Sequence, residues 1–337
     1  GAHISPEDLK RYAKVDEIPF DFTRRRVSVV AGTSDGRFLI TKGAPESVLE
    51  ICAHVELGGE TRDITPELRR TAGDGFTRLS ADGYRALAVA YKPIGNDRTV
   101  YSISDEKDLI FVGYVSFIDP PKATAEQAVQ EAERLGVSIK ILTGDNELVT
   151  ARICERVGLE VKGVLMGHEV DTLNDDELAL RAEESTICAR LSPEQKNRII
   201  MALKNKGHVL GYMGDGINDA PSLRAADVGI SVENAVDIAR EAADIILLEA
   251  GLDILDTGII EGRRTFANTL KYIMMGTSSN FGNVFSVPAA VFIVPFLPMR
   301  PVQILLNNLL YDFAQVTIPT DRVDDDQIAK PRRWNID

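Results

Sequence analysis

The chain has 337 residues, of which 44% are hydrophobic and 26% are charged. This composition is typical of a folded globular protein, and the length allows two or three compact units. The formal net charge of −13 argues against general nucleic-acid binding, because that function needs a basic surface. Cys52, Cys154 and Cys188 are too few and too scattered for a disulfide framework or a zinc site, which favours a reduced, cytoplasmic setting.

The opening residues carry no signal peptide. Ser5 and Pro6 instead have the character of a helix cap and first turn, so we expect the chain to begin within a longer protein. The region that follows has an α+β pattern. Its expected elements are strands over residues 27–31, 37–41 and 85–91, a hairpin turn at residues 34–36, and a short amphipathic helix over residues 45–55.

The pattern changes after Asp119, Pro120 and Pro121, whose fixed backbone angles mark the expected domain boundary. Apolar strand-like runs then alternate with helical stretches. The strands are expected over residues 138–142, 164–166, 186–189, 209–213, 228–230 and 245–248, and the helices over residues 124–135, 147–157 and 194–206. This alternation predicts an α/β domain with a doubly wound parallel sheet.

A third pattern begins near Leu252 and leads into residues 272–297, which contain no acidic or basic side chain. At about 1.5 Å per residue, this stretch is long enough to cross a hydrocarbon core of about 30 Å. A turn at residues 298–301 precedes a shorter apolar run over residues 302–318. The pair predicts a transmembrane helical hairpin. Both open ends are expected in the cytoplasm because they carry the basic residues Arg263, Arg264, Lys271, Lys330, Arg332 and Arg333.

Two carboxylates, Asp215 and Asp219, stand four residues apart directly after the apolar run 209–213. The carboxyl ends of parallel strands are where α/β sheets bind ligands, and carboxylate oxygens there suit Mg²⁺. The glycines of the same loop allow the backbone to approach a bound phosphate. A metal site is therefore favoured here over an ordinary acidic surface loop.

Two other fragments have the chemistry of an anion site. Thr143, Gly144 and Asp145 lie where a predicted strand passes into a helix, so a hydroxyl and free N–H groups are available; the alternative is an ordinary helix cap. Lys196 lies in the first turn of a helix, where a cation opposes the helix dipole and a phosphate partner would explain it. Its alternative is a solvated surface lysine. Each alternative is favoured when its fragment is taken alone.

Together, these fragments resemble three of the four parts of a haloacid-dehalogenase-like phosphotransferase site. They supply a threonine for the phosphoryl oxygen, a lysine for its charge and an aspartate pair for Mg²⁺. The fourth part is a nucleophilic aspartate in an Asp-Lys-Thr-Gly-Thr loop at the end of an earlier strand. That pentapeptide does not occur in this sequence.

The order of the motifs resembles that of the P-type cation-transporting ATPases. The motifs are Lys42-Gly43-Ala44, Asp119-Pro120-Pro121, Thr143-Gly144-Asp145, Pro193 with Lys196, and Gly214-Asp215-Gly216 with Asn218 and Asp219. Within that family, the wording of residues 18–30, 117–122, 141–149 and 278–286 resembles the bacterial magnesium-importing branch. The resemblance covers essentially the whole chain, and it implies a partial chain that lacks the phosphorylated aspartate loop.

The resemblance also implies roles for single residues. It places Phe20 against the adenine of ATP, Lys42 and Gly43 in the nucleotide pocket, and Arg25 and Arg85 near the phosphates. Without the resemblance, Phe20 would be assigned to the core and residues 24–26 to a solvated edge strand. The residues implied around an aspartyl phosphate and its Mg²⁺ are Thr143, Gly144, Asp145, Lys196 and Asn218, with Asp215 and Asp219 as metal ligands.

Four polar residues interrupt the predicted membrane spans. Asn280 and Asn283 share one face of the first span, and Asn308 and Asp312 share one face of the second. An ionisable residue within a span indicates a functional site, and family resemblance places the transport site at these positions. The alternative is a set of interhelical hydrogen bonds.

We therefore expect a part of an inner (plasma) membrane, multi-pass P-type ATPase. It would transport Mg²⁺, driven by ATP, through an aspartyl-phosphate intermediate, with ATP, a divalent cation and the lipid bilayer as partners. The expected parts are a nucleotide-binding domain over residues 1–116, a phosphorylation domain over 117–255, a stalk with two membrane helices over 256–319 and a cytoplasmic loop over 320–337. The alternatives are a soluble phosphatase of the same fold and a truncation that binds nucleotide without catalysis. Without the nucleophile, the isolated chain is not expected to form a phosphoenzyme.

Overall fold

The computed structural model describes residues 11–330 apart from residues 22, 35, 97, 250 and 297. The helix start expected at Ser5 and Pro6 and the basic pair Arg332 and Arg333 lie outside this described part. The chain forms two compact units. One comprises Gly1–Pro121 with Lys140–Ile246, and the other comprises Lys122–Ile139 with Leu247–Asp337.

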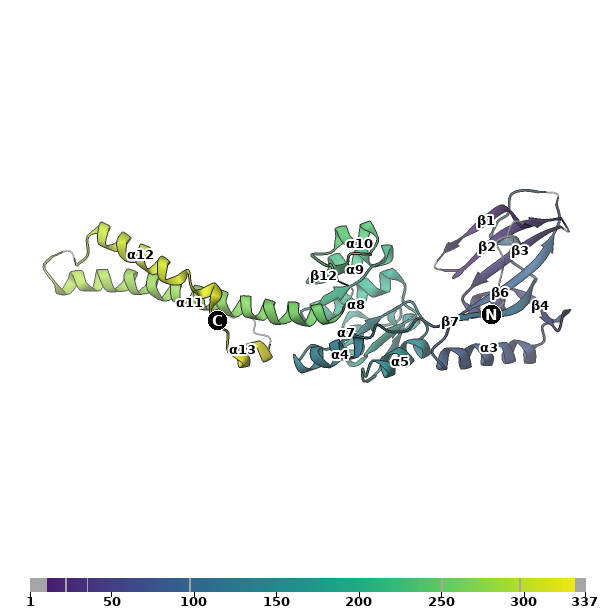
Figure 1. The fold of residues 1–337 in the computed structure, drawn as a ribbon, viewed down its shortest axis with the longest axis horizontal. Coiled ribbons are helices and arrows are strands. Elements are labelled where there is room, and N and C mark those ends of the chain that lie inside the picture. Colours follow the sequence, from purple (N-terminus) through teal and green to yellow (C-terminus); the bar gives the residue numbers. More distant parts are fainter. Residues whose placement is uncertain are drawn as a thin grey trace. The chain divides into compact units, whose positions relative to one another are not determined.

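The first unit begins with a seven-stranded sheet of order β1-β2-β3-β6-β7-β4-β5 (Figure 1). Its neighbouring strands pair antiparallel, except that β4 and β7 are parallel. The strands are β1 (Ala13–Asp21), β2 (Arg26–Thr33), β3 (Gly36–Gly43), β4 (Cys52–Leu57), β5 (Glu60–Asp63), β6 (Arg85–Ile94) and β7 (Leu109–Phe117). The predicted hairpin is confirmed, because β2 and β3 pair from Arg26 and Gly43 to Thr33 and Gly36.

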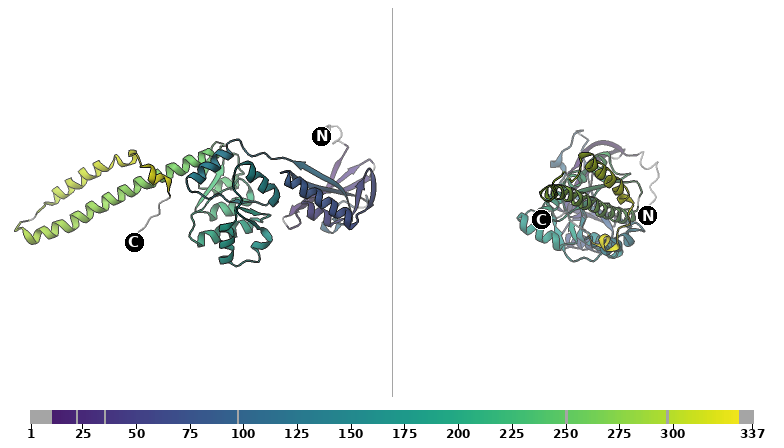
Figure 2. Two further views of the ribbon diagram at one scale, coloured as in Figure 1. Left: turned by 90° about the horizontal axis from the view of Figure 1, so that it is seen from below. Right: turned by 90° about the vertical axis from the view of Figure 1, so that its left-hand side faces the viewer.

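Two helices belong to this sheet, α2 (Pro45–Glu50) and α3 (Pro66–Ala81). Helix α3 begins after Thr65, whose hydroxyl accepts a hydrogen bond from the backbone of Leu68, and it runs beside the sheet (Figure 2). The helix predicted over residues 45–55 is too long: it ends at Glu50, and the next residues form β4. Leucine and valine side chains fill the core beneath these elements, among them the fully buried Val30, Leu39, Val48 and Leu109.

The second part of this unit has the predicted α/β alternation, but its strands form two sheets rather than one. The first, of order β8-β10-β9, is parallel throughout, and the second has the order β11-β12-β13 with β11 and β12 parallel. The strands are β8 (Ile141–Leu142), β9 (Val164–Met166), β10 (Ile187–Ala189), β11 (Gly211–Met213), β12 (Val228–Val232) and β13 (Ile245–Leu247). All six coincide with predicted strands, and several are shorter at their start.

Helices cover these sheets and bury an aliphatic core that includes Leu165, Leu178 and Ile199. They are α5 (Glu147–Arg156), α6 (Gly167–Val170), α7 (Asp175–Glu184), α8 (Pro193–Asn205), α9 (Ala220–Ala225) and α10 (Asp237–Ala242). Within the described residues, β8 and β11 are each the outermost strand on one side of their sheet. No described strand links these two edges. The described strands therefore form two sheets instead of the one doubly wound sheet that was predicted.

The second compact unit is helical. It contains α4 (Ala125–Arg134), the 41-residue α11 (Asp253–Ile293), α12 (Pro301–Gln315), the 3₁₀ turn η3 (Ile318–Thr320) and α13 (Asp325–Ala329). Helix α12 runs back beside α11 (Figures 1 and 2). The segment after α12 binds the first half of α11. Arg263 donates to the carbonyl of Ile328 at 2.8 Å, and the ammonium of Lys271 lies 2.7 Å from a carboxylate oxygen of Asp321.

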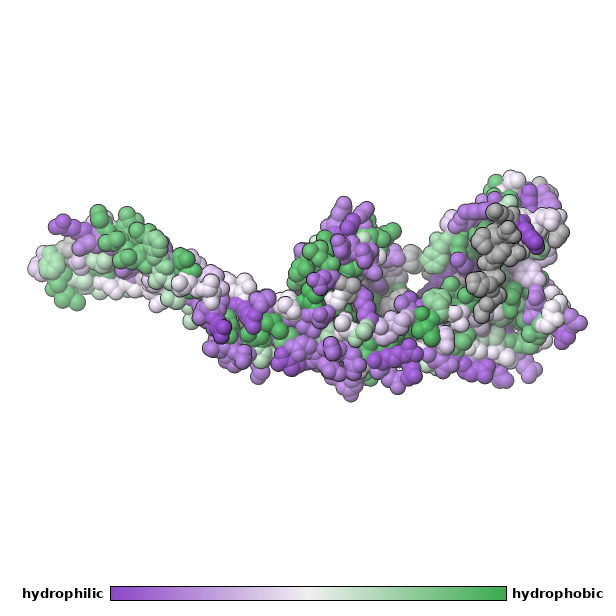
Figure 3. Space-filling model, in the orientation of Figure 1, coloured by the Kyte–Doolittle hydropathy of each residue, from purple (hydrophilic) through white to green (hydrophobic). Residues whose placement is uncertain are grey.

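The outer parts of α11 and α12 expose a broad apolar surface (green, left in Figure 3). The exposed side chains there include Val284, Phe285, Phe292, Ile293, Leu305 and Phe313. Among residues 11–330 as described, no helix combines the length and the apolar character needed to cross a bilayer. The membrane spans expected over residues 272–297 and 302–318 therefore remain unconfirmed.

Candidate functional site

The predicted lysine and one predicted aspartate meet in the structure. The ammonium nitrogen of Lys196 lies 2.9 Å from Oδ1 of Asp219, and both side chains are largely buried. Tyr212, the middle residue of β11, donates its hydroxyl to the same oxygen at 2.8 Å. The backbone N–H of Gly216 donates to the other oxygen at 3.2 Å. Asp219 is therefore held by a cation, a hydroxyl and an amide.

The start of α8 fixes the place of Lys196. Ser192 caps the helix by accepting from the backbone of Gln195, whose side chain accepts in return from the backbone of Ser192. The Gln195 side chain also donates to the carbonyl of Gly167 at 2.9 Å. This capping box satisfies free N–H groups of the first turn and holds Lys196 one residue further along the helix.

The glycine before Asp215 is required by packing. A Cβ atom on Gly214 would lie 2.5 Å from Cβ of Asp219, which is closer than real contacts allow. Gly214 also continues the strand pairing, because its N–H donates to the carbonyl of Ile230 at 3.1 Å. The glycine thus allows the loop after β11 to fold back and place Asp219 beside Tyr212.

The electrostatics of Asp219 follow from these contacts. Burial opposes ionisation, but the hydrogen bonds from Lys196 and Tyr212 outweigh it and hold the pKa of Asp219 below its ordinary value. Burial raises the pKa of the Tyr212 phenol, and the neighbouring carboxylate of Asp219 raises it further. At neutral pH the pair consists of an ionised Asp219 and a neutral tyrosine that donates to it.

A stability measurement can test this pair. Because folding lowers the pKa of Asp219, its ionised form stabilises the fold above the ordinary aspartate pKa of about 3.9, and this contribution is lost as the pH falls through the lowered value. We expect Asp219→Asn to lower the free energy of unfolding by about 1–3 kcal/mol at pH 7, less than for a fully buried pair. The gap to the unmodified chain should narrow below about pH 4 in urea titrations.

Asp237→Asn is the matched control, because Asp237 pairs with Arg240 on an exposed helix surface. It should change the unfolding free energy by less than about 0.5 kcal/mol at every pH. An Asp219→Asn effect of constant size from pH 7 to pH 3 would show that the ion pair does not contribute as the contacts indicate.

Thr143 is tied by its backbone to the segment that precedes α8. Its N–H donates to the carbonyl of Cys188 at 2.9 Å, and its own carbonyl accepts from Leu191 at 3.0 Å. Its hydroxyl accepts from the backbone of Asp145 at 3.0 Å. The cap of α5 is Asn146, so Thr143 is not the ordinary helix cap that was the alternative. The threonine loop and the lysine helix are therefore adjoining parts of one structure.

Asp215 and Asn218 have exposed side chains in the loop after β11. The backbone carbonyl of Asp215 accepts a hydrogen bond from the N–H of Val236 at 3.1 Å. Within the described contacts, its carboxylate pairs with neither a lysine nor an arginine. Across the described residues, no group of three or more His, Cys, Asp or Glu side chains is arranged to hold a metal ion. Asp215 and Asp219 are the two carboxylates of the predicted metal site.

Arg85, a predicted phosphate ligand, pairs with two carboxylates in the structure. Its guanidinium lies 2.7 Å from an oxygen of Asp145 and 3.1 Å from an oxygen of Asp119. Gly144 packs against the segment before α8, since a Cβ there would lie 3.4 Å from the carbonyl oxygen of Leu191. Arg85 thereby joins the end of the first sheet to the Thr143 loop.

The predicted nucleotide residues lie on the first sheet. Arg25 lines an open cleft of about 1070 Å³, together with Arg24, Arg26, Ser47, Arg69 and Arg190. Phe20, near the end of β1, and Lys42, in β3, have exposed side chains and do not line that cleft. A Cβ on Gly43 would lie 2.4 Å from the carbonyl of Arg25, so this glycine lets β3 pass close to the arginine turn.

Three functional candidates were missed from the sequence. Tyr212 sits inside an apolar run, and only the structure reveals its hydroxyl beside Asp219. Arg190 follows β10 with a φ of 56° and lies 2.5 Å from Glu46 and 2.7 Å from Glu147. The third is the buried Glu106. The positive φ of Arg190 gives no signal in the sequence, because arginine has no preference for that conformation.

Of the four predicted transport residues, the structure brings two together. The side-chain amide of Asn283 in α11 donates to that of Asn308 in α12 at 3.3 Å. Asn280 and Asp312 have exposed side chains, and neither makes a side-chain hydrogen bond or ion pair in the described part of the chain. This contact is an interhelical hydrogen bond, and the transport site at these four residues stays a prediction.

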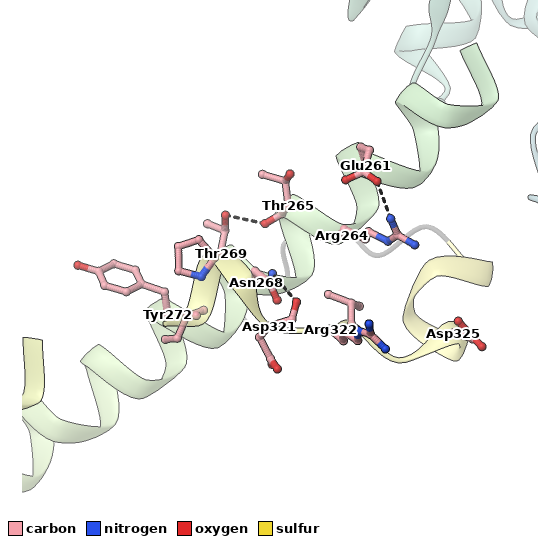
Figure 4. A pocket seen from close by; sticks show the side chains of 12 residues that line it. Glu261, Arg264, Thr265, Asn268, Thr269, Tyr272, Asp321, Arg322 and Asp325 are labelled. Carbon is pink, nitrogen blue, oxygen red and sulfur yellow. Dashed lines mark hydrogen bonds and ion pairs between the residues drawn. The ribbon is translucent and has the colours of Figure 1, made fainter. Parts of the chain in front are cut away.

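A second pocket, of about 790 Å³, lies along α11 and the segment after α12 (Figure 4). Asn268 donates to the carbonyl of Asp321 at 3.3 Å within it, and Glu261 pairs with Arg264 at its rim. None of the residues predicted to surround a phosphate lines it.

The fold and the site define a class of protein. Parallel α/β strands followed by a threonine loop, a lysine helix and an aspartate loop are the arrangement of a haloacid-dehalogenase-like domain, which is here joined to an α+β domain. Two family models match accordingly. Residues 67–227 match the haloacid dehalogenase-like hydrolases, and residues 4–124 match cytoplasmic domain N of the P-type ATPases.

The chain belongs to the P-type ATPase family, which confirms the resemblance. It is 54% identical to the magnesium-transporting ATPase, P-type 1, of Escherichia coli strain K12 over 96% of this chain and 36% of that protein. The protein of the same description from Salmonella typhimurium strain LT2 is 52% identical over the same shares. Calcium-transporting ATPase 1 of Lactococcus lactis is 31% identical over 98% of this chain and 38% of that protein. The chain thus spans little more than a third of the length of these relatives.

Proposed function

We propose that this chain is a working part of an ATP-driven magnesium transporter that forms an aspartyl phosphate. The contact between Lys196 and Asp219, beside the loop of Thr143, carries the proposal. A lysine ammonium has three donors, so Lys196 can hold Asp219 and still donate to a phosphoryl oxygen. Phosphoryl transfer relies on such positioned charge rather than on complex covalent chemistry. The similarity to two magnesium-transporting ATPases supports Mg²⁺ as the cargo.

The nucleophile is proposed to come from a further strand. Strands β8 and β11 are outermost in their sheets as described, and the loops at their carboxyl ends carry Thr143 and Asp215. A parallel strand between them would pair with both edges and complete one doubly wound sheet. Its own carboxyl end would bring an aspartate between the threonine, the lysine and the metal-binding loop.

Mg²⁺ fits the residues of the loop after β11. Asp215 offers an exposed carboxylate, and hard oxygen ligands with several retained waters are what this ion prefers. Asp215 would hold the ion, Asp219 would support it from beside Lys196, and Asn218 and the backbone near Gly144 would orient the phosphoryl group. When bound, Mg²⁺ neutralises charge on the transferring phosphate.

ATP is proposed to bind on the first sheet. Phe20 offers an exposed aromatic face for adenine, Lys42 an exposed ammonium, and Arg25 a guanidinium in the cleft. Arg85 would exchange Asp145 for a phosphate when the nucleotide reaches the Thr143 loop. Such an exchange keeps the guanidinium paired in both states, which limits the cost of the change.

The helical unit is proposed to insert in the inner membrane, with both ends of the hairpin in the cytoplasm. The absence of charged side chains over residues 272–297 and the exposed apolar surface support this placement. The Asn283–Asn308 contact would lie within the hairpin, with Asn280 and Asp312 completing an oxygen-rich cation site. Helix α11 would transmit movement from the cytoplasmic domains to that site.

Nucleotide binding tests the proposal on the chain as it is. We expect Phe20→Ala to weaken ATP binding about tenfold, because base–aromatic stacking contributes about 1–3 kcal/mol. Isothermal titration calorimetry with ATP measures the affinity. Phe117→Ala is the matched control, since Phe117 is similarly exposed in the same sheet, at 45% against 51% for Phe20. Equal affinities for the unmodified chain and a folded Phe20→Ala variant would remove Phe20 from the adenine site.

A further inference from the structure

Glu106 is the most deeply buried acidic residue described in the first sheet domain, with 3% of its surface exposed. It follows the short 3₁₀ turn Ile103–Asp105 and precedes β7. A carboxylate in such surroundings is costly unless charged or polar partners compensate it. The partners of Glu106 show what the carboxylate organises.

Four hydrogen bonds converge on the Glu106 carboxylate. Arg24 donates to both oxygens at 2.7 Å, and Arg26 donates to one of them at 2.8 Å. Ser28 donates its hydroxyl to the other oxygen at 2.7 Å, and its Oγ lies 2.7 Å from the hydroxyl of Thr41. The contacts join residues about 80 positions apart in the chain. Burial opposes ionisation, but the donors hold the pKa of Glu106 below its ordinary value.

The two arginines flank Arg25, whose side chain does not bind Glu106. The backbone of Arg25 has a φ of 51° and is fixed by two hydrogen bonds, one to the carbonyl of Asp21 at 2.8 Å and one from the N–H of Ala44 at 2.9 Å. Its guanidinium makes no hydrogen bond or ion pair within the described residues. Arg24, Arg25 and Arg26 all line the cleft, but only Arg24 and Arg26 are paired with Glu106.

We infer that Glu106 is a positioning residue that holds the turn at residues 23–25 so that the guanidinium of Arg25 faces the phosphates of a nucleotide in the cleft. This inference rests on the proposed function, because it takes ATP as the ligand. Glu106 does not touch the ligand. It clamps the residues on both sides of Arg25 and thereby restricts the backbone that carries the free guanidinium.

The physical basis is preorganisation. A turn held in a positive φ region is strained for arginine and persists only when its surroundings determine it. The carboxylate also neutralises charge from Arg24 and Arg26, which would otherwise repel Arg25 within the same turn. A guanidinium fixed before binding loses less conformational entropy when it meets a phosphate.

A double-mutant cycle tests the inference on the whole chain. ATP affinity is measured by calorimetry for the unmodified chain, Glu106→Gln, Arg25→Ala and the double variant. We expect Glu106→Gln and Arg25→Ala each to weaken ATP binding about five- to tenfold, and the double variant to be no weaker than Arg25→Ala alone. Glu106→Gln keeps the shape of the side chain. Adenosine, which lacks phosphates, should bind equally to all four proteins.

Glu56→Gln is the matched control, because Glu56 is a carboxylate of the same domain that accepts a hydrogen bond from Tyr91 at 2.8 Å. It should leave ATP affinity unchanged. Ser28→Ala is a milder second variant, which removes one donor to Glu106 and should weaken ATP binding about twofold only when Arg25 is present. Circular dichroism and thermal melting establish that each variant is folded.

Additive losses in either cycle, or an equal loss of adenosine binding, would overturn the positioning role and leave the proposed function intact. Failure of the unmodified chain to bind ATP would overturn the proposed function and this inference together. The two failures are thus distinguishable in a single set of titrations.

Discussion

In a longer chain that also carries an Asp-Lys-Thr-Gly-Thr loop, Lys196→Ala is expected to lower the rate of phosphoenzyme formation by about 10²–10³-fold. The loss has two sources. The developing charge on the phosphoryl group loses a fixed ammonium, and Asp219 loses the cation that lies 2.9 Å from it. Because Asp219 is largely buried, its carboxylate would then repel the incoming phosphate. The initial rate of labelling with γ-labelled ATP measures the effect.

Lys206→Ala is the control for that measurement. Lys206 follows the same helix and pairs with Glu183 on a more exposed surface. Its removal should change the labelling rate less than twofold. A Lys196→Ala protein that is folded and labels at the normal rate would show that the lysine serves only to hold Asp219.

Val284→Arg is expected to reduce membrane insertion about a hundredfold. Val284 lies near the middle of residues 272–297 on α11, and 63% of its surface is exposed. An arginine at the centre of a membrane helix costs about 2.5–3.5 kcal/mol on insertion scales. The partition of the chain between lipid vesicles and buffer, followed by flotation, measures the change.

Thr257→Arg provides the comparison, because Thr257 is exposed on the same helix within its first two turns. Under the proposed placement it lies outside the bilayer, so the substitution should leave flotation unchanged. If both substitutions have the same effect, or if the unmodified chain stays in the buffer, the hairpin does not enter lipid as proposed.

Much of the secondary structure could be predicted because the apolar pattern reports it locally. The strand expected over residues 164–166 matches β9, and the third pattern expected near Leu252 begins in the structure as α11 at Asp253. The helix over residues 45–55 was overextended because Cys52–Leu57 is short and ambiguous. Pairing with β5 and β7 decides that it is a strand, and those partners lie elsewhere in the sequence.

The division of the α/β sheet could not be read from periodicity. Each strand was identified from its own apolar run, but the pattern does not state which strands are neighbours. The outer positions of β8 and β11 depend on whether another strand is available to pair with them. Sheet continuity is therefore a property of the assembled chain rather than of its single elements.

The site could be predicted where its residues follow strands directly. Asp215 and Asp219 after β11 and Thr143 after β8 are of this kind, and Lys196 was identified from its place in a helix. The contacts of Arg85 with Asp119 and Asp145 were not foreseen, because they join residues far apart in the sequence. The role of Glu106 could not be predicted for the same reason, because its arginine partners lie about 80 residues earlier in the sequence.

The most direct test of a single phosphate site is acid-quenched labelling with γ-labelled ATP and Mg²⁺. The longer chain with its Asp-Lys-Thr-Gly-Thr loop should acquire a label that survives acid and is released by hydroxylamine, as an acyl phosphate is. The 337-residue chain alone should acquire none, because Thr143, Lys196, Asp215 and Asp219 would surround a phosphate without supplying the nucleophile. A hydroxylamine-labile label on the 337-residue chain, or an unlabelled longer chain that binds ATP, would contradict the account.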